Sequence, residues 1–342
     1  MPQKHLYTTI KKLPIDLSLS ENPLGCSSKV LHVLKTISPA DCFNYPDPRA
    51  TPLIAALSHH FHIPMDSILM ANGSEALIKL IPQALLKPGE TALIPRLTFP
   101  LFDSAVTLAG GKVIHSRMTP NLDIDLDDIK SKLTPPPKLI FLCNPNNPTG
   151  KTMTKASIVN LLQQTSASVI VDEANIEFGG QTVIDQVKKL TNLIVIRTFS
   201  KALGLAGLRL GFCVAHPKLI RTLKQISQVF PVSTLAQKAA LAALQDHQFI
   251  NRTKALMDKE GRFLTQELRS RGLHVIDSNA NNLFVKVTPL FSSSTACINR
   301  LNSHGVSVVN GLAFGQLGKN FIRISPRSHQ INIRFLNIID QL

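Results

Sequence analysis

The chain has 342 residues, more than one hydrophobic core usually serves, so we expect two domains. A hydrophobic fraction of 44 % excludes a disordered chain, and no apolar run reaches the roughly 18 residues needed to span a membrane. The net charge of +15 is dispersed and accompanies no nucleic-acid-binding motif, so it favours small anionic substrates over nucleic acid.

Short apolar runs alternate with helix-like segments through the first two thirds of the chain. The runs are bounded by turn residues and rich in β-branched residues, which is typical of buried, mostly parallel strands. A helix is predicted at 74–86. The predicted strands are 67–71, 91–95, 112–115, 138–143, 168–172, 192–197 and 209–214. Their alternation with helices predicts an α/β sheet covered by helices on both faces.

From about residue 233 the pattern changes to that of a smaller α+β domain. Helices are predicted at 233–244 and 252–271, followed by short strands at 282–287, 306–309 and 321–324. The N-terminal segment is expected to pack with this smaller domain. The predicted organisation is therefore an N-terminal segment at 1–41, a large domain at 42–235 and a small domain at 236–342.

The N-terminus and the cysteines both favour a cytoplasmic protein. The first seven residues are mildly basic and lack the apolar stretch of a signal peptide. The five cysteines are scattered, odd in number and form no C-x-x-C pair. Free thiols in a reducing compartment fit this pattern, and a zinc site or other metal site does not.

One lysine stands where chemistry is expected. A predicted strand ends in a hydroxyl-rich turn that projects Lys201, and Arg209 follows eight residues later. A lysine that forms a Schiff base needs a neutral amine, which burial or neighbouring cations provide. Thr198 and Ser200 could hold a phosphate together with Arg209. A surface lysine beside a glycine turn is the alternative, but the whole stretch at 197–211 favours a functional site.

Polar side chains also follow two other predicted strands. Asp172 ends a buried strand, where a carboxylate is costly unless it is paired, and a protonated pyridine nitrogen would supply the partner. The alternative is a helix cap, and the adjacent Glu173 is interpreted as structural. The C-N-P-N-N-P-T-G stretch at 143–150 predicts a rigid turn that aims one asparagine, Asn147, at the phenolic oxygen of a bound ring.

Two weaker signals lie nearer the N-terminus. Gly73, Ser74 and Glu75 occupy a strand-to-helix junction, where exposed backbone N–H groups bind anions, although an ordinary helix cap fits equally well. Phe99 follows the next predicted strand and could stack on a flat heterocycle. A core phenylalanine is the ordinary alternative, since the chain has 16 of them.

Together these stretches resemble the fold-type I pyridoxal-phosphate (PLP) enzymes of the class I and II aminotransferases, and within them the histidinol-phosphate aminotransferase family. The resemblance covers nearly the whole chain and includes S-E-N-P at 20–23, Y-P-D-P at 45–48 and R-I-S at 323–325. It implies a large domain with a mostly parallel, seven-stranded-type sheet. It also implies PLP as cofactor, a homodimer, and nitrogen transfer from histidinol phosphate to 2-oxoglutarate, giving imidazole acetol phosphate and glutamate.

The resemblance also implies a role for each site residue. Lys201 would carry the cofactor as a Schiff base and move a proton between the substrate Cα and the cofactor C4′. Asp172 would pair with the pyridine nitrogen. The remaining cofactor contacts would come from Gly73, Ser74, Glu75, Phe99, Asn147, Asn175, Thr198, Ser200 and Arg209, and from Tyr45 across the dimer interface. The substrate would be bound by Arg323 and Asn22.

The chain departs from the family at three positions. Asn175 replaces a tyrosine that bonds the ring oxygen, so we expect a shifted cofactor pKa or weaker cofactor binding. Leu24 stands where a tyrosine near the substrate phosphate is common, and the strand at 306–309 leads to Asn310 instead of a phosphate-binding arginine. Arg327 or Lys319 could compensate for these lost contacts.

Three alternatives stay open. A PLP-dependent decarboxylase that resembles threonine-phosphate decarboxylase shares nearly all these motifs, and N-P-L-G at 22–25 leans towards it. An aromatic amino-acid aminotransferase would share the mechanism with a different donor. A PLP-binding regulator without catalysis would need a DNA-binding domain, and the resemblance already begins near residue 14.

Overall fold

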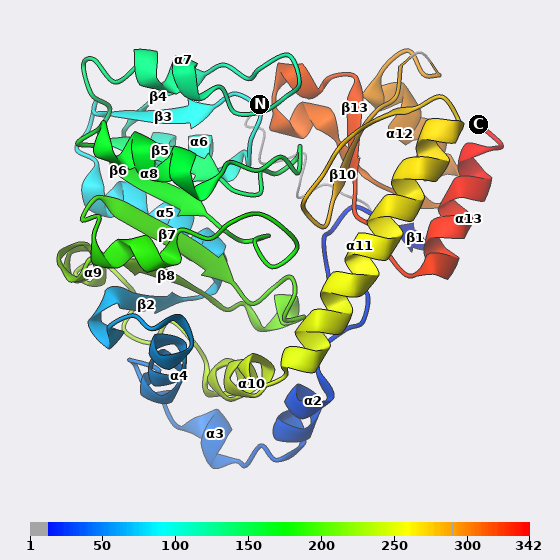
Figure 1. Cartoon of the computed structure of the whole chain (residues 1–342). Coiled ribbons are helices and arrows are strands. Elements are labelled where there is room, and N and C mark those ends of the chain that lie inside the picture. The colour runs from blue at the N-terminus through cyan, green and yellow to red at the C-terminus, as the bar shows by residue number, and fades with distance from the viewer. Residues whose placement is uncertain (1–12, 289) are drawn as a thin grey trace.

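A seven-stranded sheet forms the centre of the larger part of the molecule. In the computed structural model, which describes residues 13–288 and 290–342, its strands lie in the order β2-β8-β7-β6-β5-β3-β4 (Figure 1). The strands are β2 (Ile68–Ala71), β3 (Thr91–Pro95), β4 (Lys112–Ser116), β5 (Leu139–Cys143), β6 (Ser168–Asp172), β7 (Leu193–Thr198) and β8 (Gly211–Ala215). β8 runs antiparallel to β2 and β7, and the other neighbours are parallel. The mostly parallel sheet expected from the sequence is confirmed.

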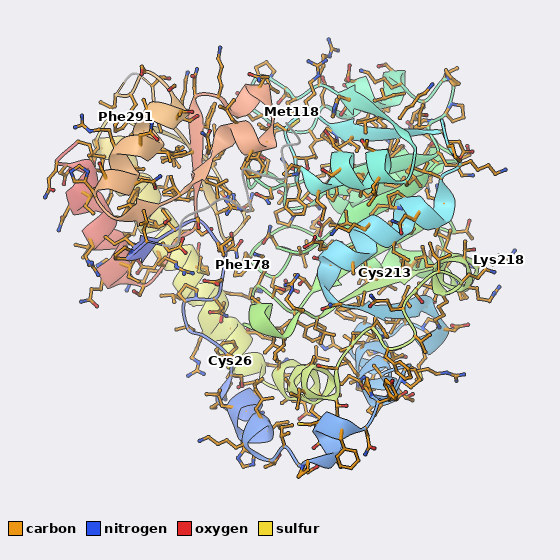
Figure 2. The ribbon with its side chains drawn as sticks, turned by 180° about the vertical axis from the view of Figure 1, so that it is seen from behind. Cys26, Met118, Phe178, Cys213, Lys218 and Phe291 are labelled. Atoms are coloured by element: carbon orange, nitrogen blue, oxygen red, sulfur yellow. The ribbon has the colours of Figure 1, made fainter. Side chains whose placement is uncertain are left out.

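Helices cover both faces of this sheet. Alternate residues of a strand point to opposite faces, so Ile140 and Leu142 enter one core while Leu139 and Phe141 enter the other. On the first face lie α4 (Thr51–Phe61), α7 (Leu126–Ser131), α8 (Lys155–Gln163) and α10 (Thr234–Leu244). On the second lie α5 (Gly73–Leu85), α6 (Leu101–Leu108) and α9 (Pro217–Lys224). The second face is in front in Figure 2, where Cys213 marks β8.

The smaller part is built on a four-stranded antiparallel sheet in the order β12-β13-β10-β9. Its strands are β9 (His274–Ile276), β10 (Leu283–Lys286), β12 (Val309–Asn310) and β13 (Phe321–Ile324). The long α11 (His247–Ser270) packs on it with α12 (Ser294–Ser303) and α13 (His329–Ile339) (Figure 1). No helix within 13–288 or 290–342 is both long and apolar enough to cross a membrane.

The two parts meet at several places. A small apolar cluster joins Leu97, beside β3, to Phe284 of β10 and to Phe314. The loop after β6 also reaches α11, where Phe178 lines a surface pocket with Met257 (Figure 2). These contacts hold the carboxyl ends of the large sheet against the small sheet.

The N-terminal segment contributes to both cores. Its β1 (Ile15–Asp16) pairs in parallel with β11 (Val306–Ser307) in the smaller part. Its α2 (Ser28–Lys35) instead places Val30 in the core under α10, and α3 (Ala40–Phe43) follows. Both α2 and α10 therefore pack with the large sheet, although the sequence assigned them to 1–41 and 236–342. The domain boundaries stay a prediction.

Three predicted elements differ from the structure. The strand predicted at 209–214 begins at Gly211, because Arg209 adopts a left-handed conformation with φ of +53°. The strand predicted at 306–309 is two short strands that pair with different partners, β1 and β13. The helix predicted at 252–271 begins earlier, because the side chain of Asp246 accepts from the Phe249 N–H and caps it.

Candidate active site

A pocket of about 400 Å³ lies where β5, β6 and β7 end and β8 begins. This is the edge at which parallel α/β sheets bind ligands. Eleven residues predicted for the site line it together, namely Ser74, Glu75, Phe99, Asn147, Asp172, Asn175, Thr198, Ser200, Lys201, Arg209 and Arg323. The fold thus brings residues from separate turns and from β13 into one cavity.

Lys201 has the properties of a nucleophilic amine. Burial lowers its pKa from 10.5 to about 8, and the positive charges of Arg323 and Arg209 act in the same direction. Glu21 and Asp172 oppose this effect with their negative charges. A lysine with this pKa has a substantial neutral fraction near physiological pH, so it can attack a carbonyl group.

Asp172 is a buried acid without a cationic partner at bonding distance among the described residues. Burial raises its pKa to about 6, although the Ala174 N–H donates to its Oδ1 at 3.0 Å and Lys201 attracts it electrostatically. The adjacent charge of Glu173 raises the pKa further. A protonated ring nitrogen placed against this carboxylate would satisfy it, so the residue fits the pyridine ring of PLP.

Of the three asparagines in the turn at 143–150, two form hydrogen bonds within the chain and one lines the pocket. Asn144 accepts from the Met153 N–H at 2.8 Å and donates back to the Met153 carbonyl. Asn146 is buried, where it accepts from the Thr98 hydroxyl at 2.8 Å and donates to the Leu97 carbonyl. Asn147 is the asparagine that lines the pocket, as the sequence predicted.

A cradle for an anion lies at the N-terminus of α5. The Asn72 side chain caps none of the first-turn N–H groups, and Ser74 and Glu75 line the pocket there. Gly73 has φ of +79°, and a Cβ at this position would approach the Arg209 guanidinium to 2.9 Å. Thr198 and Ser200 line the same pocket, and the Thr198 hydroxyl donates to the Ser200 hydroxyl at 3.0 Å. These donors fit a phosphate group.

Asn175 carries an unsatisfied polar atom into the pocket. Its side chain is only 6 % exposed, and among the described residues no donor reaches its Oδ1. Buried amides are normally bonded, so a group that is absent from the bare chain would be expected to complete it. A ring hydroxyl that retains its proton would donate to this oxygen, so Asn175 fits the hydroxyl-bearing edge of the PLP ring.

The residues next to Asp172 and Thr198 form a buried ion network. Glu173 pairs with Arg197 at 2.9 Å and accepts from the Thr182 hydroxyl and the Val183 N–H, each at 2.7 Å. Arg197 also pairs with Glu177 at 2.6 Å. This network ties the loop after β6 to the end of β7, which confirms the structural interpretation of Glu173.

Three predicted site residues lie outside the pocket wall. Gly73 leaves room for the Arg209 guanidinium, which a Cβ at this position would approach to 2.9 Å. The amide nitrogen of Asn22 donates to the Ala202 carbonyl and to the Thr253 hydroxyl, each at 3.0 Å, and the substrate contact predicted for it stays a prediction. Tyr45 is 82 % exposed and stacks on Phe230 with ring centres 4.7 Å apart.

The two residues proposed to replace missing phosphate contacts do not line the pocket either. Arg327 pairs with Glu21 at 3.1 Å, just outside the wall. Lys319 is exposed at the turn before β13. Compensation by either residue therefore stays a prediction.

The pocket also contains residues that sequence reasoning did not assign to it. They are Leu19, Ser20, Glu21, Cys143, Ala174, Ala206, Gly207 and Asn282. Cys143, Ala174, Ala206 and Gly207 lie within the recognised motifs, so their neighbours were a sufficient signal. Ser20 and Glu21 lie within the S-E-N-P stretch, although no role was assigned to them, whereas Asn282 comes from a segment without such a signal.

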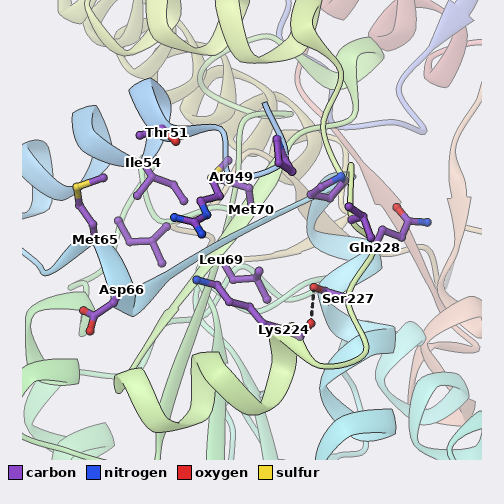
Figure 3. A pocket seen from close by; sticks show the side chains of 14 residues that line it. Arg49, Thr51, Ile54, Met65, Asp66, Leu69, Met70, Lys224, Ser227 and Gln228 are labelled. Atoms are coloured by element: carbon purple, nitrogen blue, oxygen red, sulfur yellow. Dashed lines mark hydrogen bonds between the residues drawn. The ribbon is translucent and has the colours of Figure 1, made fainter. Parts of the chain in front are cut away.

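A second cavity of about 510 Å³ lies at the outer edge of β2, between α4 and α9 (Figure 3). Its wall includes Arg49, Asp66, Met70 and Lys224, and most of the surface is apolar. None of the predicted site residues lines it, and no strand of the large sheet ends there on the carboxyl side. The smaller pocket is therefore the better candidate for catalysis.

Comparisons with known proteins point to one family. The family model of aminotransferase class I and II matches residues 13–338. A "Histidinol-phosphate aminotransferase 2" from Carboxydothermus hydrogenoformans is 34 % identical over 94 % of this chain and 89 % of its own length. A histidinol-phosphate aminotransferase from Methanosphaera stadtmanae is 29 % identical over 98 % of this chain and 92 % of its own. The solved histidinol-phosphate aminotransferase of Sinorhizobium meliloti in complex with pyridoxal-5'-phosphate has a TM-score of 0.87 at 23 % identity, covering 100 % of this chain and 95 % of that one.

Proposed function

Because the chain belongs to the class I and II aminotransferases, which depend on PLP, we propose that it transfers the amino group of histidinol phosphate to 2-oxoglutarate. The observation that carries the proposal is the pocket that joins Lys201, with its lowered pKa, to the buried Asp172 and the anion cradle at α5. The names of full-length relatives that are 29 % and 34 % identical support this donor.

Each side chain has a task in this reaction. PLP, when bound, supplies a conjugated ring that accepts the electrons of the substrate's Cα–H bond. Lys201 holds the cofactor, and its released Nζ takes the proton from the substrate Cα. Asp172 keeps the ring nitrogen protonated, and Asn147 and Asn175 orient the ring through its oxygen. Phe99 packs against the ring face.

The anionic groups are bound at two ends of the pocket. The cofactor phosphate is assigned to the N–H groups of Ser74 and Glu75 with Thr198, Ser200 and Arg209. Arg323 is assigned to the anionic group of the substrate. It is buried, and its Nη1 donates at 3.4 Å to the Oδ1 of Asn147, the residue proposed to bond the ring oxygen, which supports this assignment.

A homodimer would complete the site. Tyr45 and the neighbouring Phe43 are exposed by 82 % and 75 %, and such large exposed side chains are typical of an interface. In our proposal Tyr45 reaches the cofactor phosphate of the partner subunit. We also propose a cytoplasmic enzyme, in keeping with its five free cysteines.

The test is spectroscopic. Purified protein should be yellow with bound PLP, and Lys201→Ala should lack the absorbance band. Histidinol phosphate should bleach the band, and 2-oxoglutarate should restore it. Release of carbon dioxide instead of nitrogen transfer would identify a decarboxylase. Bleaching by aromatic amino acids but not by histidinol phosphate would reassign the donor.

A further inference from the structure

Three acidic side chains line the candidate pocket, and two of them have a role already. Asp172 is assigned to the ring nitrogen in the proposed function. Glu75 lies in the first turn of α5 and pairs with Lys79 at 2.5 Å, at the cofactor-phosphate end. Glu21 is the third, and neither the cofactor nor the reaction chemistry proposed above requires it. A carboxylate in a pocket for anionic ligands calls for an explanation, because it repels them.

The position of Glu21 is fixed relative to Arg323. Arg323 donates to the Ser18 carbonyl, and the Ser325 N–H donates to the Leu17 carbonyl at 2.8 Å. The hydroxyl of Ser20 bonds that of Ser325 at 2.7 Å. The segment that ends in Glu21 is thus bound to the strand that carries the substrate's anion-binding residue. The pocket therefore presents a cation and a carboxylate at a set spacing.

The carboxylate of Glu21 retains acceptor capacity. Its Oε2 pairs with Arg327 at 3.1 Å, and among the described residues no donor bonds Oε1. The side chain is 41 % exposed. Its negative charge also raises the pKa of Lys201, against the effect of Arg323, so both charges act on the space where a substrate meets this amine. A carboxylate can accept several hydrogen bonds at once.

We propose that Glu21 selects the amine donor by accepting a hydrogen bond from its imidazole N–H. This inference rests on the proposed function. Histidinol phosphate carries an anionic phosphate and an N–H-bearing ring on either side of its amine, which matches an arginine and a carboxylate held apart in one pocket. An aromatic ring without an N–H would leave the Glu21 carboxylate without that bond and is disfavoured.

The experiment compares two amino-alcohol phosphate donors in the PLP-loaded enzyme. Histidinol phosphate and phenylalaninol phosphate share the amine and the phosphate, and only the first ring donates a hydrogen bond. Glu21→Gln should lower kcat/KM for histidinol phosphate about tenfold, mainly through KM, because a charge-assisted bond becomes a neutral one. The value for phenylalaninol phosphate should stay within about twofold, so the preference for imidazole falls about tenfold.

Arg327→Met is the matched control, since it removes the partner of Glu21 and keeps the carboxylate. It should change both donors alike and preserve the preference for imidazole. If Arg327→Met lowers the preference as much as Glu21→Gln does, Glu21 only anchors Arg327 and the inference is wrong. An unchanged preference in Glu21→Gln also overturns it, with the proposed function intact. A wild type that is inactive on histidinol phosphate overturns both.

Discussion

Replacement of Lys201 should stabilise the protein in the absence of PLP, and the gain should depend on pH. The pKa of this lysine lies at about 8 in the folded chain, against an ordinary value of 10.5. At about 1.36 kcal/mol per pH unit, the buried ammonium then costs roughly 3 kcal/mol below pH 8. The side chain retains some exposure, so this is an upper value.

The sign of the pH dependence follows from proton binding. Below pH 8 both the folded and the unfolded chain carry the proton, and the cost is complete. Between pH 8 and pH 10.5 the unfolded chain binds more protons, so the stability contributed by this group rises with pH. Lys201→Met removes the charge at every pH. Its stabilising effect should therefore be largest at pH 7 and fall by about 2 kcal/mol at pH 10.

Urea denaturation of the PLP-free protein at both pH values measures this difference. Lys259→Met, on an exposed site of α11, corrects for the loss of a surface lysine. Other groups titrate equally in all variants and cancel. If the stability difference between Lys201→Met and wild type is the same at pH 7 and pH 10, the amine is not desolvated in the folded chain. The account of its nucleophilicity would then be refuted.

Three further variants test other parts of the site. Arg197→Met should lower the free energy of unfolding by about 3–5 kcal/mol in thermal or urea denaturation, because it leaves the buried Glu173 without its cation; a loss below about 1 kcal/mol would contradict this. Gly73→Ala should weaken PLP binding about tenfold in equilibrium dialysis, because the added Cβ would displace the Arg209 guanidinium. An unchanged affinity would show that Arg209 does not bind the cofactor phosphate. Asn175→Tyr should move the titration midpoint of the bound-PLP absorbance about one pH unit lower, since a phenol donates a stronger bond to the ring oxygen, and identical curves would exclude this.

Much of the fold could be predicted because local pattern and tertiary context agree. The β5, β6 and β7 strands are short, β-branched and bounded by turns, and they are buried on both faces. The strand at 306–309 was mispredicted for the opposite reason. Its apolar residues form one continuous run in the sequence, which predicts a single strand. In the structure β11 and β12 pair with strands of different sheets, and the sequence of this segment does not indicate which strand each half pairs with.

The two ends of the pocket differ in the same way in how well the sequence predicts them. The proposed cofactor end is made by turns that directly follow β2, β5, β6 and β7, so each of its lining residues lies within a few residues of a recognisable strand. In the substrate end, the Ser18 carbonyl meets Arg323 across 305 residues of chain. No spacing in the sequence connects these positions. This is why Lys201 and Asp172 could be predicted to line the pocket, while the S-E-N-P stretch gave no indication that Glu21 would lie in the same cavity as Arg323.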